Sequence, residues 1–284
     1  MKKITLLIHC KDRSNIIARV TNFIADQGGN IVYLDQHVDR EQNIFFMRLE
    51  AEFQNSDFST ENFKEIFNSK LAEDFKMKWR VYSSESQTKM ALFVSKYDHC
   101  LYDLLGRYHS GELPLEIPFI ISNHKDLKSI ADRFSIPFYH IPVTKDNKVQ
   151  AEERQLELLK KYRIDFIVLA RYMQIVTSKI ISEYPNKIIN IHHSFLPAFV
   201  GAKPYHSAFK RGVKIIGATS HYVTEDLDAG PIIEQDVAHV SHTHTIQDLI
   251  AKGRDLEKIV LSNAVKLHAN RKVMVYNNKT VIFS

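Results

Sequence analysis

Residues suited to acyl chemistry occur in two nearby segments of the chain. Asn190 and His192 end an apolar run, and side-chain alternation along a strand puts both on the same face. After a second apolar run at 215–222, the glycine-bounded segment 225–230 carries carboxylates that a loop can bring beside them. An amide can hold an oxyanion, an imidazole can donate to it or protonate a leaving nitrogen, and a carboxylate can take a proton from the nucleophile. This combination predicts attack on an amide-like carbonyl.

Spacing leaves several roles open around these residues. Asp226 and Asp228 lie two positions apart on the same loop and compete for the carboxylate role. His193 alternates away from His192, and we interpret it as a packing residue and not as the acid. A core histidine at a strand end is the alternative for His192 itself, and His221, on a strand face, favours a structural role.

The first 83 residues must form a separate module, because their elements follow the order β-α-β-β-α-β. This order is typical of a ferredoxin-like α+β domain. A helix that Ser14 can cap ends at Gly28 and Gly29. The expected strands cover 5–9, 30–38, 44–52 and 78–82, and the second helix carries its apolar face over 63–71.

A polar stretch at 84–88 predicts a linker, and strands alternate with helices throughout 89–284. Such alternation indicates a doubly wound, mostly parallel sheet that would position the candidate residues at a strand end. The end of the region differs, with a long helix over 245–268 and then a hairpin. The expected strands are 91–94, 119–122, 138–141, 166–169, 187–191 and the hairpin strands 273–276 and 279–283.

Composition excludes several classes of protein. With 284 residues, 44% hydrophobic and 25% charged, the chain is typical of a globular protein with two domains. The net charge is +5, but Lys and Arg are spread along the chain without a basic stripe, so no nucleic-acid partner is expected. A solvated surface and attraction of a polyanionic small molecule both explain the charge.

Neither a membrane segment nor a secretion signal is expected. No apolar run approaches the roughly 18 residues that span a bilayer. The segment Met1–Ile8 contains a short apolar run, and the charged residues Asp12 and Arg13 follow it closely. This pattern favours a first strand over a signal peptide. We therefore expect a cytoplasmic protein.

Cysteine and histidine usage does not indicate a metal site. Cys10 and Cys100 are the two cysteines, too few for a secreted disulfide framework, and we expect both to be buried and inert. His239, His242 and His244 form a cluster that could suggest zinc, but no cysteine or carboxylate has fitting spacing. We expect no metal.

The segments around Asn190 and Asp228 also carry a resemblance. The pattern N-I-H-x-S-x-L-P from Asn190, continued to His206, and the pattern D-x-D-x-G-P-I-I from Asp226 resemble the folate-dependent formyltransferases. Within this family, the longer string that continues to His206 resembles the formyltetrahydrofolate deformylase branch. The likeness extends over about 89–283. It includes the run Gly253–Glu257.

The first module resembles an ACT domain, in which such turns often bind an amino acid at a subunit interface. The resemblance rests on the element order and on the turn Asp12–Ile16. ACT domains of this family usually carry glycine where Asn15 stands, but asparagine also tolerates a left-handed backbone. The resemblance implies a homo-oligomer with a possible amino-acid effector, and pairing between subunits is an equal alternative to sensing.

The resemblance also implies site residues. It assigns Asn190, His192 and Asp228 as catalytic and selects Asp228 over Asp226. The segment after the strand at 166–169 would form the pterin pocket, closed on its other side by the loop before Asp228. The implied substrate-binding residues are Met173, Gln174, Ile175, Thr224, Glu225 and Leu227.

The expected acceptor is water. Relatives that formylate glycinamide ribonucleotide have a glycine-rich turn after the first strand of this region, whereas the segment 95–102 contains no glycine. The resemblance therefore implies hydrolysis of 10-formyltetrahydrofolate to tetrahydrofolate and formate, with the folate as a substrate and no cofactor. The alternatives are an amine formyltransferase, which would release no formate without amine, and a non-catalytic folate- and amino-acid-sensing protein, which would fail a single-turnover assay.

Overall fold

The computed structural model describes residues 2–54, 58–198 and 204–283 of the chain. These residues form two compact units. The first comprises Met1–Gln87 with Arg271–Tyr276 and Val281–Ser284, and the second comprises Thr88–Asn270 with Asn277–Thr280. The sequence interpretation placed all of 89–284 in one region, whereas the two carboxyl-terminal segments group with the first unit.

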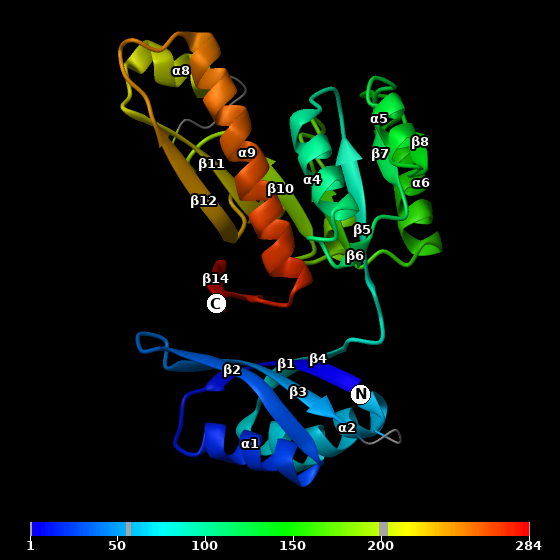
Figure 1. Ribbon diagram of the computed structural model, residues 1–284, viewed down its shortest axis with the longest axis vertical. Coiled ribbons are helices and arrows are strands. Elements are labelled where there is room, and N and C mark those ends of the chain that lie inside the picture. Colours follow the sequence, from blue (N-terminus) through cyan, green and yellow to red (C-terminus); the bar gives the residue numbers. More distant parts are fainter. Residues whose placement is uncertain (1, 55–57, 199–203, 284) are drawn as a thin grey trace. The chain divides into compact units, whose positions relative to one another are not determined.

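The first unit is an antiparallel sheet with the strand order β2-β3-β1-β4, whose one face is covered by helices (Figure 1). This arrangement confirms the predicted ferredoxin-like fold. The strands are β1 (Lys2–Lys11), β2 (Gly29–Asp39), β3 (Ile44–Phe53) and β4 (Lys78–Ser83), and the helices are α1 (Ile16–Asp26), α2 (Thr60–Phe67), η1 (Asn68–Ala72) and α3 (Glu73–Phe75).

Both faces of this sheet bury apolar side chains. On the helical face, residues spaced by about one helical turn, such as Val20 and Ile24 of α1, are fully buried. In a second cluster, Leu7 and Phe46 are buried with Met274 of β13 (Val273–Tyr276) and with Phe283, which follows β14 (Lys279–Ile282). The carboxyl-terminal strands thus complete the core of the first unit.

Two predicted turns are decided by backbone conformation. Asn15 has a φ of 69° and is the N-cap of α1 without a side-chain cap, so the left-handed turn persists and the prediction that Ser14 caps the helix is wrong. Asn277 and Asn278 have φ values of 45° and 58° between β13 and β14. Asparagine is among the few residues that tolerate this conformation, which confirms the predicted tight hairpin.

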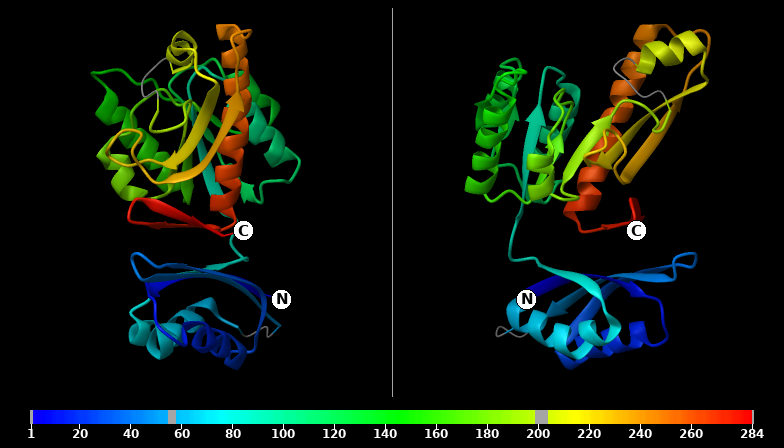
Figure 2. Two further views of the ribbon diagram at one scale, coloured as in Figure 1. Left: turned by 90° about the vertical axis from the view of Figure 1, so that its left-hand side faces the viewer. Right: turned by 180° about the vertical axis from the view of Figure 1, so that it is seen from behind.

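The second unit contains a sheet with the strand order β12-β11-β10-β9-β5-β7-β8 (Figure 2). The strands from β10 to β8 are parallel, and β11 and β12 add antiparallel pairs at one edge. The predicted mostly parallel, doubly wound sheet is confirmed. Its strands are β5 (Thr88–Val94), β6 (Leu115–Glu116, paired with β5), β7 (Ile120–Ser122), β8 (Phe138–His140), β9 (Phe166–Leu169), β10 (Ile188–His192), β11 (Ile215–Tyr222) and β12 (Ile232–His239).

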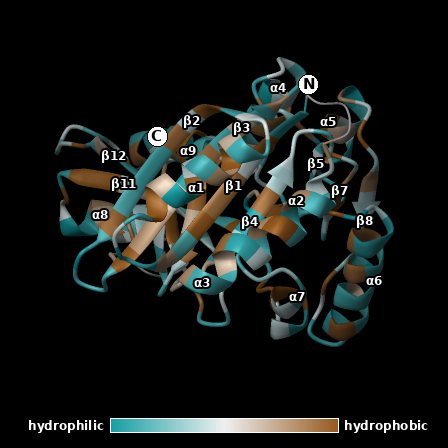
Figure 3. Ribbon diagram, turned by 90° about the horizontal axis from the view of Figure 1, so that it is seen from below, coloured by the Kyte–Doolittle hydropathy of each residue, from teal (hydrophilic) through white to brown (hydrophobic). Residues whose placement is uncertain are grey.

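Amphipathic helices connect these strands. In Figure 3, the helix α6 alternates between hydrophilic and hydrophobic colouring along its length, as expected for a helix that packs on a sheet. In the described residues, no helix is long and apolar enough to cross a membrane. The helices are α4 (His99–His109), α5 (Lys128–Arg133), α6 (Lys148–Lys161), α7 (Ser178–Glu183), α8 (Pro204–Arg211) and α9 (Ile246–Ala269).

The long helix α9 begins with a capping box, in which the side chains of Thr245 and Asp248 bond each other's backbone N–H groups. It packs against α4, α8 and the strands β10 to β12. In the parallel sheet, β7 and β8 lie on one side of β5, while β9 and β10 lie on the other. The strand order therefore reverses between β5 and β9, and open α/β sheets bind ligands at such a point.

Candidate active site

The strand β10 positions the amide and the imidazole. Asn190 and His192 are two residues apart, so their side chains share one face of the sheet. In the antiparallel pairing with β11, Asn190 lies opposite His221 and His192 lies opposite Thr219. The pairing thus adds a second imidazole to the same face.

A carboxylate joins these side chains from the loop between β11 and β12. Asp228 Oδ2 lies 3.2 Å from Nδ1 of His192, and Asp228 Oδ1 lies 3.6 Å from Nε2 of His221. Asn190 Nδ2 is 3.2 Å from the same Nε2 of His221. We refer to Asn190, His192, His221 and Asp228 as the Asp228 cluster, in which the structure brings together all three predicted catalytic residues.

The backbone of the loop aims Asp228 at these histidines. Asp228 has a φ of 56°, a left-handed conformation that aspartate tolerates better than most residues. Two residues later, a Cβ atom on Gly230 would lie 1.8 Å from the carbonyl oxygen of Tyr222, so only glycine allows this close approach. The Ala229 N–H donates to the carbonyl of Asp226 and closes the turn.

The electrostatics of the cluster follow from these contacts. The adjacent imidazoles of His192 and then of His221 hold the pKa of Asp228 well below its usual range, against the opposing effect of burial. His192 is buried, and no described residue hydrogen-bonds its Nε2. One ring nitrogen of His192 is therefore fixed by a carboxylate, while the other is free for a ligand.

His221 takes part in the Asp228 cluster, although its position on a strand face favours a structural role. Its Nδ1 is 2.9 Å from the carbonyl oxygen of Tyr222, which only accepts, so Nδ1 carries a proton. In the neutral ring, Nε2 then accepts from the Asn190 amide; in the charged ring, it donates to Asp228. Its place in the cluster follows from the pairing register opposite Asn190, which the sequence alone does not supply.

Comparison with known proteins identifies the family. A formyl transferase family model matches residues 88–265, and an ACT domain model matches residues 4–57. The chain is 52% identical over 280 residues to a formyltetrahydrofolate deformylase of Synechocystis, covering 99% of this chain and 98% of that protein. The crystal structure of a formyltetrahydrofolate deformylase from Pseudomonas syringae matches with a TM-score of 0.96 and 47% identity, covering 100% of this chain and 95% of that one. The chain belongs to the formyltetrahydrofolate deformylase family.

A more distant likeness concerns the second unit. The glycinamide ribonucleotide transformylase 1 of Symbiobacterium toebii matches with a TM-score of 0.67 and 27% identity, over 72% of this chain and 97% of that one. The deformylase family thus shares its formyltransferase fold with enzymes named for another formyl acceptor.

The first predicted folate-binding segment follows β9, at the reversal of strand order. Met173 is 50% exposed and Ile175 is 62% exposed, so two large apolar side chains of this segment lie open to solvent. Gln174 is half-buried between them. The Met173 N–H donates to the buried Ser95 hydroxyl at 2.9 Å, which fixes this segment to the end of β5.

The second predicted folate-binding segment precedes Asp228 in the loop after β11. Thr224 is half-buried, whereas Glu225 and Leu227 are exposed, Leu227 by 66%. The Thr224 hydroxyl donates to the carbonyl of Asp226 at 3.1 Å, so this loop is braced from within. The Asp226 side chain is exposed, whereas Asp228 contacts both histidines.

A second buried carboxylate was not predicted. Glu257 of α9 lies 2.8 Å from His99 Nε2, accepts from the Tyr205 hydroxyl at 2.7 Å, and lies 3.3 Å from Arg171 Nε. We refer to these four residues together with Cys100 as the Glu257 cluster. Burial raises the pKa of Glu257, but the His99 hydrogen bond and the Arg171 charge outweigh it, and the net pKa lies below its usual range.

The Glu257 cluster also contains three metal-ligating residues close together. The ligand atoms of His99, Cys100 and Glu257 lie within 4.8 Å of one another. However, the Arg171 guanidinium already supplies the positive charge beside Glu257, and burial raises the pKa of the Cys100 thiol well above its usual range. These residues therefore do not suit a cation.

The sequence also contains the histidine cluster His239, His242 and His244. In it, His244 accepts at Nδ1 from the Ser241 N–H.

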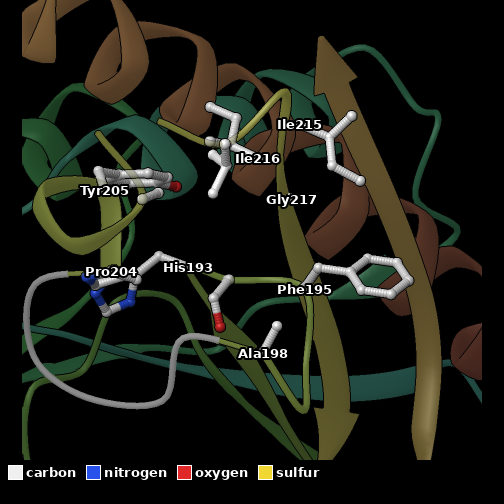
Figure 4. Close-up of a pocket in the computed structure, with 11 residues that line it drawn as sticks. His193, Phe195, Ala198, Pro204, Tyr205, Ile215, Ile216 and Gly217 are labelled. Carbon is white, nitrogen blue, oxygen red and sulfur yellow. The ribbon is translucent and has the colours of Figure 1, made fainter. Parts of the chain in front are cut away.

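A cavity of about 140 Å³ lies beside the end of β10 (Figure 4). His193, Phe195, Tyr205 and Ile216 are among its lining residues, and the lining is almost wholly apolar. His193 is buried there, as predicted for a packing residue. The part of the family string that covers 199–203 lies outside the described residues.

Proposed function

We propose that the Asp228 cluster hydrolyses 10-formyltetrahydrofolate to tetrahydrofolate and formate, with Asn190, His192 and Asp228 as the catalytic residues. The observation that carries this assignment is the state of His192. Its Nδ1 is held by a carboxylate at 3.2 Å, and its buried Nε2 has no described partner. An imidazole in this arrangement can exchange a proton with a bound substrate.

The proton transfers balance through one imidazole. His192 Nε2 takes a proton from the attacking water, while the water oxygen bonds to the formyl carbon. The Asn190 N–H that His221 does not accept stabilises the oxyanion. The imidazolium then donates its proton to N10 as the carbon–nitrogen bond breaks, which releases tetrahydrofolate and formic acid, and the acid ionises to formate.

The lowered pKa of Asp228 changes the role that the sequence analysis gave it. The expected role was proton acceptance through a bound water. A carboxylate whose pKa is held well below its usual range is a weak proton acceptor, but its constant negative charge stabilises the imidazolium that forms at His192. We therefore assign proton acceptance to His192, and orientation and charge stabilisation to Asp228.

The two exposed segments are proposed to bind the folate. Met173 and Ile175 would cover the faces of the pterin, and Gln174 and the backbone would bond its polar edge. Leu227, with Thr224 and Glu225, would close the site from the loop that also carries Asp228.

A single-turnover measurement tests this assignment. The purified chain, mixed with 10-formyltetrahydrofolate and no amine, should release one formate per site. In His192→Ala, the rate constant of this release should be lower by at least about 10²-fold. Folate binding by the variant, followed by fluorescence, should persist. Formate release by His192→Ala at the rate of the parent would overturn the proposed role of His192.

The ACT unit is proposed to bind an amino acid and to assemble the chain as a homo-oligomer. Its left-handed turn at Asn15 is intact, which supports the ACT resemblance. Deformylation rates with each amino acid, together with the mass by light scattering, test both statements. An unchanged rate with every amino acid would contradict the effector, and a monomer would contradict the assembly. We likewise propose a cytoplasmic location.

A further inference from the structure

The carboxyl-terminal hairpin carries polar side chains that the proposed reaction does not use. Its strands are β13 and β14, and its turn, Asn277–Thr280, is grouped with the second unit. Asn278 and Thr280 lie on either side of Lys279, the first residue of β14. Both donate hydrogen bonds to the segment that follows Asp228.

These two side-chain bonds join the turn to the loop that carries Asp228. We refer to residues 223–231, between β11 and β12, as the Asp228 loop. Nδ2 of Asn278 donates to the carbonyl oxygen of Ala229 at 2.9 Å, and Oγ1 of Thr280 donates to that of Ile232 at 2.6 Å. Ala229 directly follows Asp228, and Ile232 is the first residue after the loop. The hairpin therefore holds the chain after Asp228 at two points.

The second of these points also concerns a histidine of the Asp228 cluster. In the pairing of β11 with β12, Ile232 lies opposite His221, and the register shifts between Ser220 and His221. Such irregularities are common next to active sites, where they change the direction of a side chain. The bond from Thr280 thus fixes the residue paired with His221.

The internal bonds of the Asp228 loop fix its shape but not its position. The Thr224 hydroxyl and the Ala229 N–H both donate to the carbonyl of Asp226, so all three partners belong to the loop. Asp228 itself has a left-handed φ of 56°, and a residue with a Cβ atom keeps this conformation when its surroundings enforce it. A bond from Asn278 to the next residue supplies such a constraint.

The hairpin is built to act as a support. Asn278 has a φ of 58°, which asparagine tolerates, so the turn presents the amide at little cost in backbone strain. At the other end of the hairpin, the Phe283 N–H donates to the carbonyl of Lys272 at 2.9 Å. Chain ends are poorly ordered unless such pairing ties them down. The pairing therefore gives Asn278 and Thr280 a defined position near the end of the chain.

We propose that Asn278 and Thr280 are positioning residues for the deformylation, which act through the carbonyls of Ala229 and Ile232 to hold Asp228 against His192. Asp228 is the group through which both act, and a small displacement of such a group lowers the rate strongly. This inference deepens the proposed function and rests on it, since it concerns the alignment of the same carboxylate.

Asn278→Gly tests the inference with little change to the backbone. Glycine accepts a positive φ, so the substitution removes the amide donor and keeps the turn. Loss of one hydrogen bond of ordinary strength shifts the balance between the aligned and the displaced loop by about fivefold. We therefore expect kcat to fall by about fivefold, with folate affinity within about twofold of the parent. Asn277→Gly is the matched control, because Asn277 lies in the same turn with a φ of 45°, and it should keep the kcat of the parent.

Thr280 allows a conservative pair of variants. Thr280→Val keeps the branched shape and removes the hydroxyl, whereas Thr280→Ser keeps the hydroxyl and removes a methyl group. We expect kcat to fall by about fivefold in Thr280→Val and to stay within about twofold of the parent in Thr280→Ser. Equal losses in both variants would contradict a role for the bond to Ile232.

Two further measurements separate positioning from general stability. In an Asp228→Asn background, Asn278→Gly should lower kcat no further, because the group that it positions has already lost its charge. Hydrogen exchange at the Ala229 N–H, measured on the full chain without substrate, should be about fivefold faster in Asn278→Gly than in Asn277→Gly.

Equal kcat and equal exchange in Asn278→Gly and Asn277→Gly would overturn the inference, as would a further fivefold loss in the double variant. Formate release by the parent without amine tests the proposed function separately. Because the exchange measurement needs no turnover, the two proposals fail by different measurements.

Discussion

Two carboxylates of the second unit are each bonded by imidazole, but their surroundings differ. The Asp228 side chain is 14% exposed and contacts two histidines, His192 and His221. The Glu257 side chain is 2% exposed and contacts a histidine, a tyrosine and the guanidinium of Arg171. Carboxylate and imidazole thus occur in both clusters. We call the more exposed Asp228 cluster open and the Glu257 cluster closed.

The partners decide what each carboxylate can do. Arginine stays charged at all relevant pH values, so the charge beside Glu257 is permanent and the cluster is static. Histidine bonds both carboxylates, and His99 like His192 has one ring nitrogen without a described partner, but no guanidinium among the described residues lies beside Asp228. A carboxylate takes part in proton transfer when its partners can change protonation state and one of them faces a ligand; otherwise it holds the structure in one state.

The largest effect is expected from Asp228→Asn. The substitution removes the charge that stabilises the His192 imidazolium, and asparagine accepts the left-handed φ of 56°, so the loop should keep its course. We expect kcat to fall by about 10²–10⁴-fold, with folate affinity within about tenfold of the parent. Steady-state kinetics and equilibrium binding measure the two quantities.

Asp226→Asn is the matched control, two residues away on the same loop with an exposed side chain. It should retain most activity, because the described contacts of Asp226 use its backbone carbonyl. If the control is inactive while Asp228→Asn turns over normally, the catalytic carboxylate has been assigned to the wrong residue.

In the closed cluster, Glu257→Gln should lower the free energy of unfolding. It leaves the Arg171 guanidinium buried without a counter-charge, and breaking a buried ion pair costs about 3–5 kcal/mol. Urea unfolding should show this loss as a lower midpoint at an unchanged slope. Asp132→Asn, which breaks an exposed pair with Lys128, should cost less than about 1 kcal/mol. Equal losses in the two variants would contradict the closed character of the Glu257 cluster.

Asn190→Ala tests the oxyanion donor of the open cluster. Loss of one such donor costs about 10²–10³-fold in kcat, while KM should change little because the interaction forms in the transition state. Ser220→Ala is the control, since among the described residues the Ser220 hydroxyl donates to the backbone carbonyl of Asn190 alone. An Asn190→Ala enzyme within about fivefold of the parent kcat would remove Asn190 from the mechanism.

The smallest effect concerns acid stability. The pKa of Asp228 is lowered on folding, so its contribution is present above the ordinary carboxyl pKa of about 4 and is lost as the pH falls below it. The Tm of the parent should therefore fall more steeply than that of Asp228→Asn between about pH 5 and pH 3. Calorimetry at several pH values measures both slopes, and parallel curves would show that Asp228 binds the same number of protons in both states.

Local patterns predicted much of this fold. The apolar run before Asn190 predicted β10, the periodicity after Thr245 predicted α9, and paired asparagines predicted the hairpin. In contrast, β12 was not predicted, because its burial is irregular and polar residues such as Glu234 and Asp236 interrupt its alternation. The catalytic trio was found because a strand end and a glycine-bounded loop are local features.

The remaining features depend on contacts between distant positions. His99 and Glu257 are separated by 158 residues, and each alone is typical of a helix surface. His221 joins the Asp228 cluster only through its register opposite Asn190. Met274 belongs to a strand with ordinary apolar alternation, which does not reveal the unit that it completes. Such features require the tertiary pairing, which a single sequence does not supply.

The grouping of β13 with the first unit has a consequence for synthesis on the ribosome. Leu7 and Phe46 are covered by Met274 and Phe283, which are translated roughly 190 residues after the end of the amino-terminal segment. At about 5–20 residues per second, this delay is roughly 10–40 s. During this interval the nascent ACT sheet exposes an apolar face, so the module translated first is among the last to complete its core.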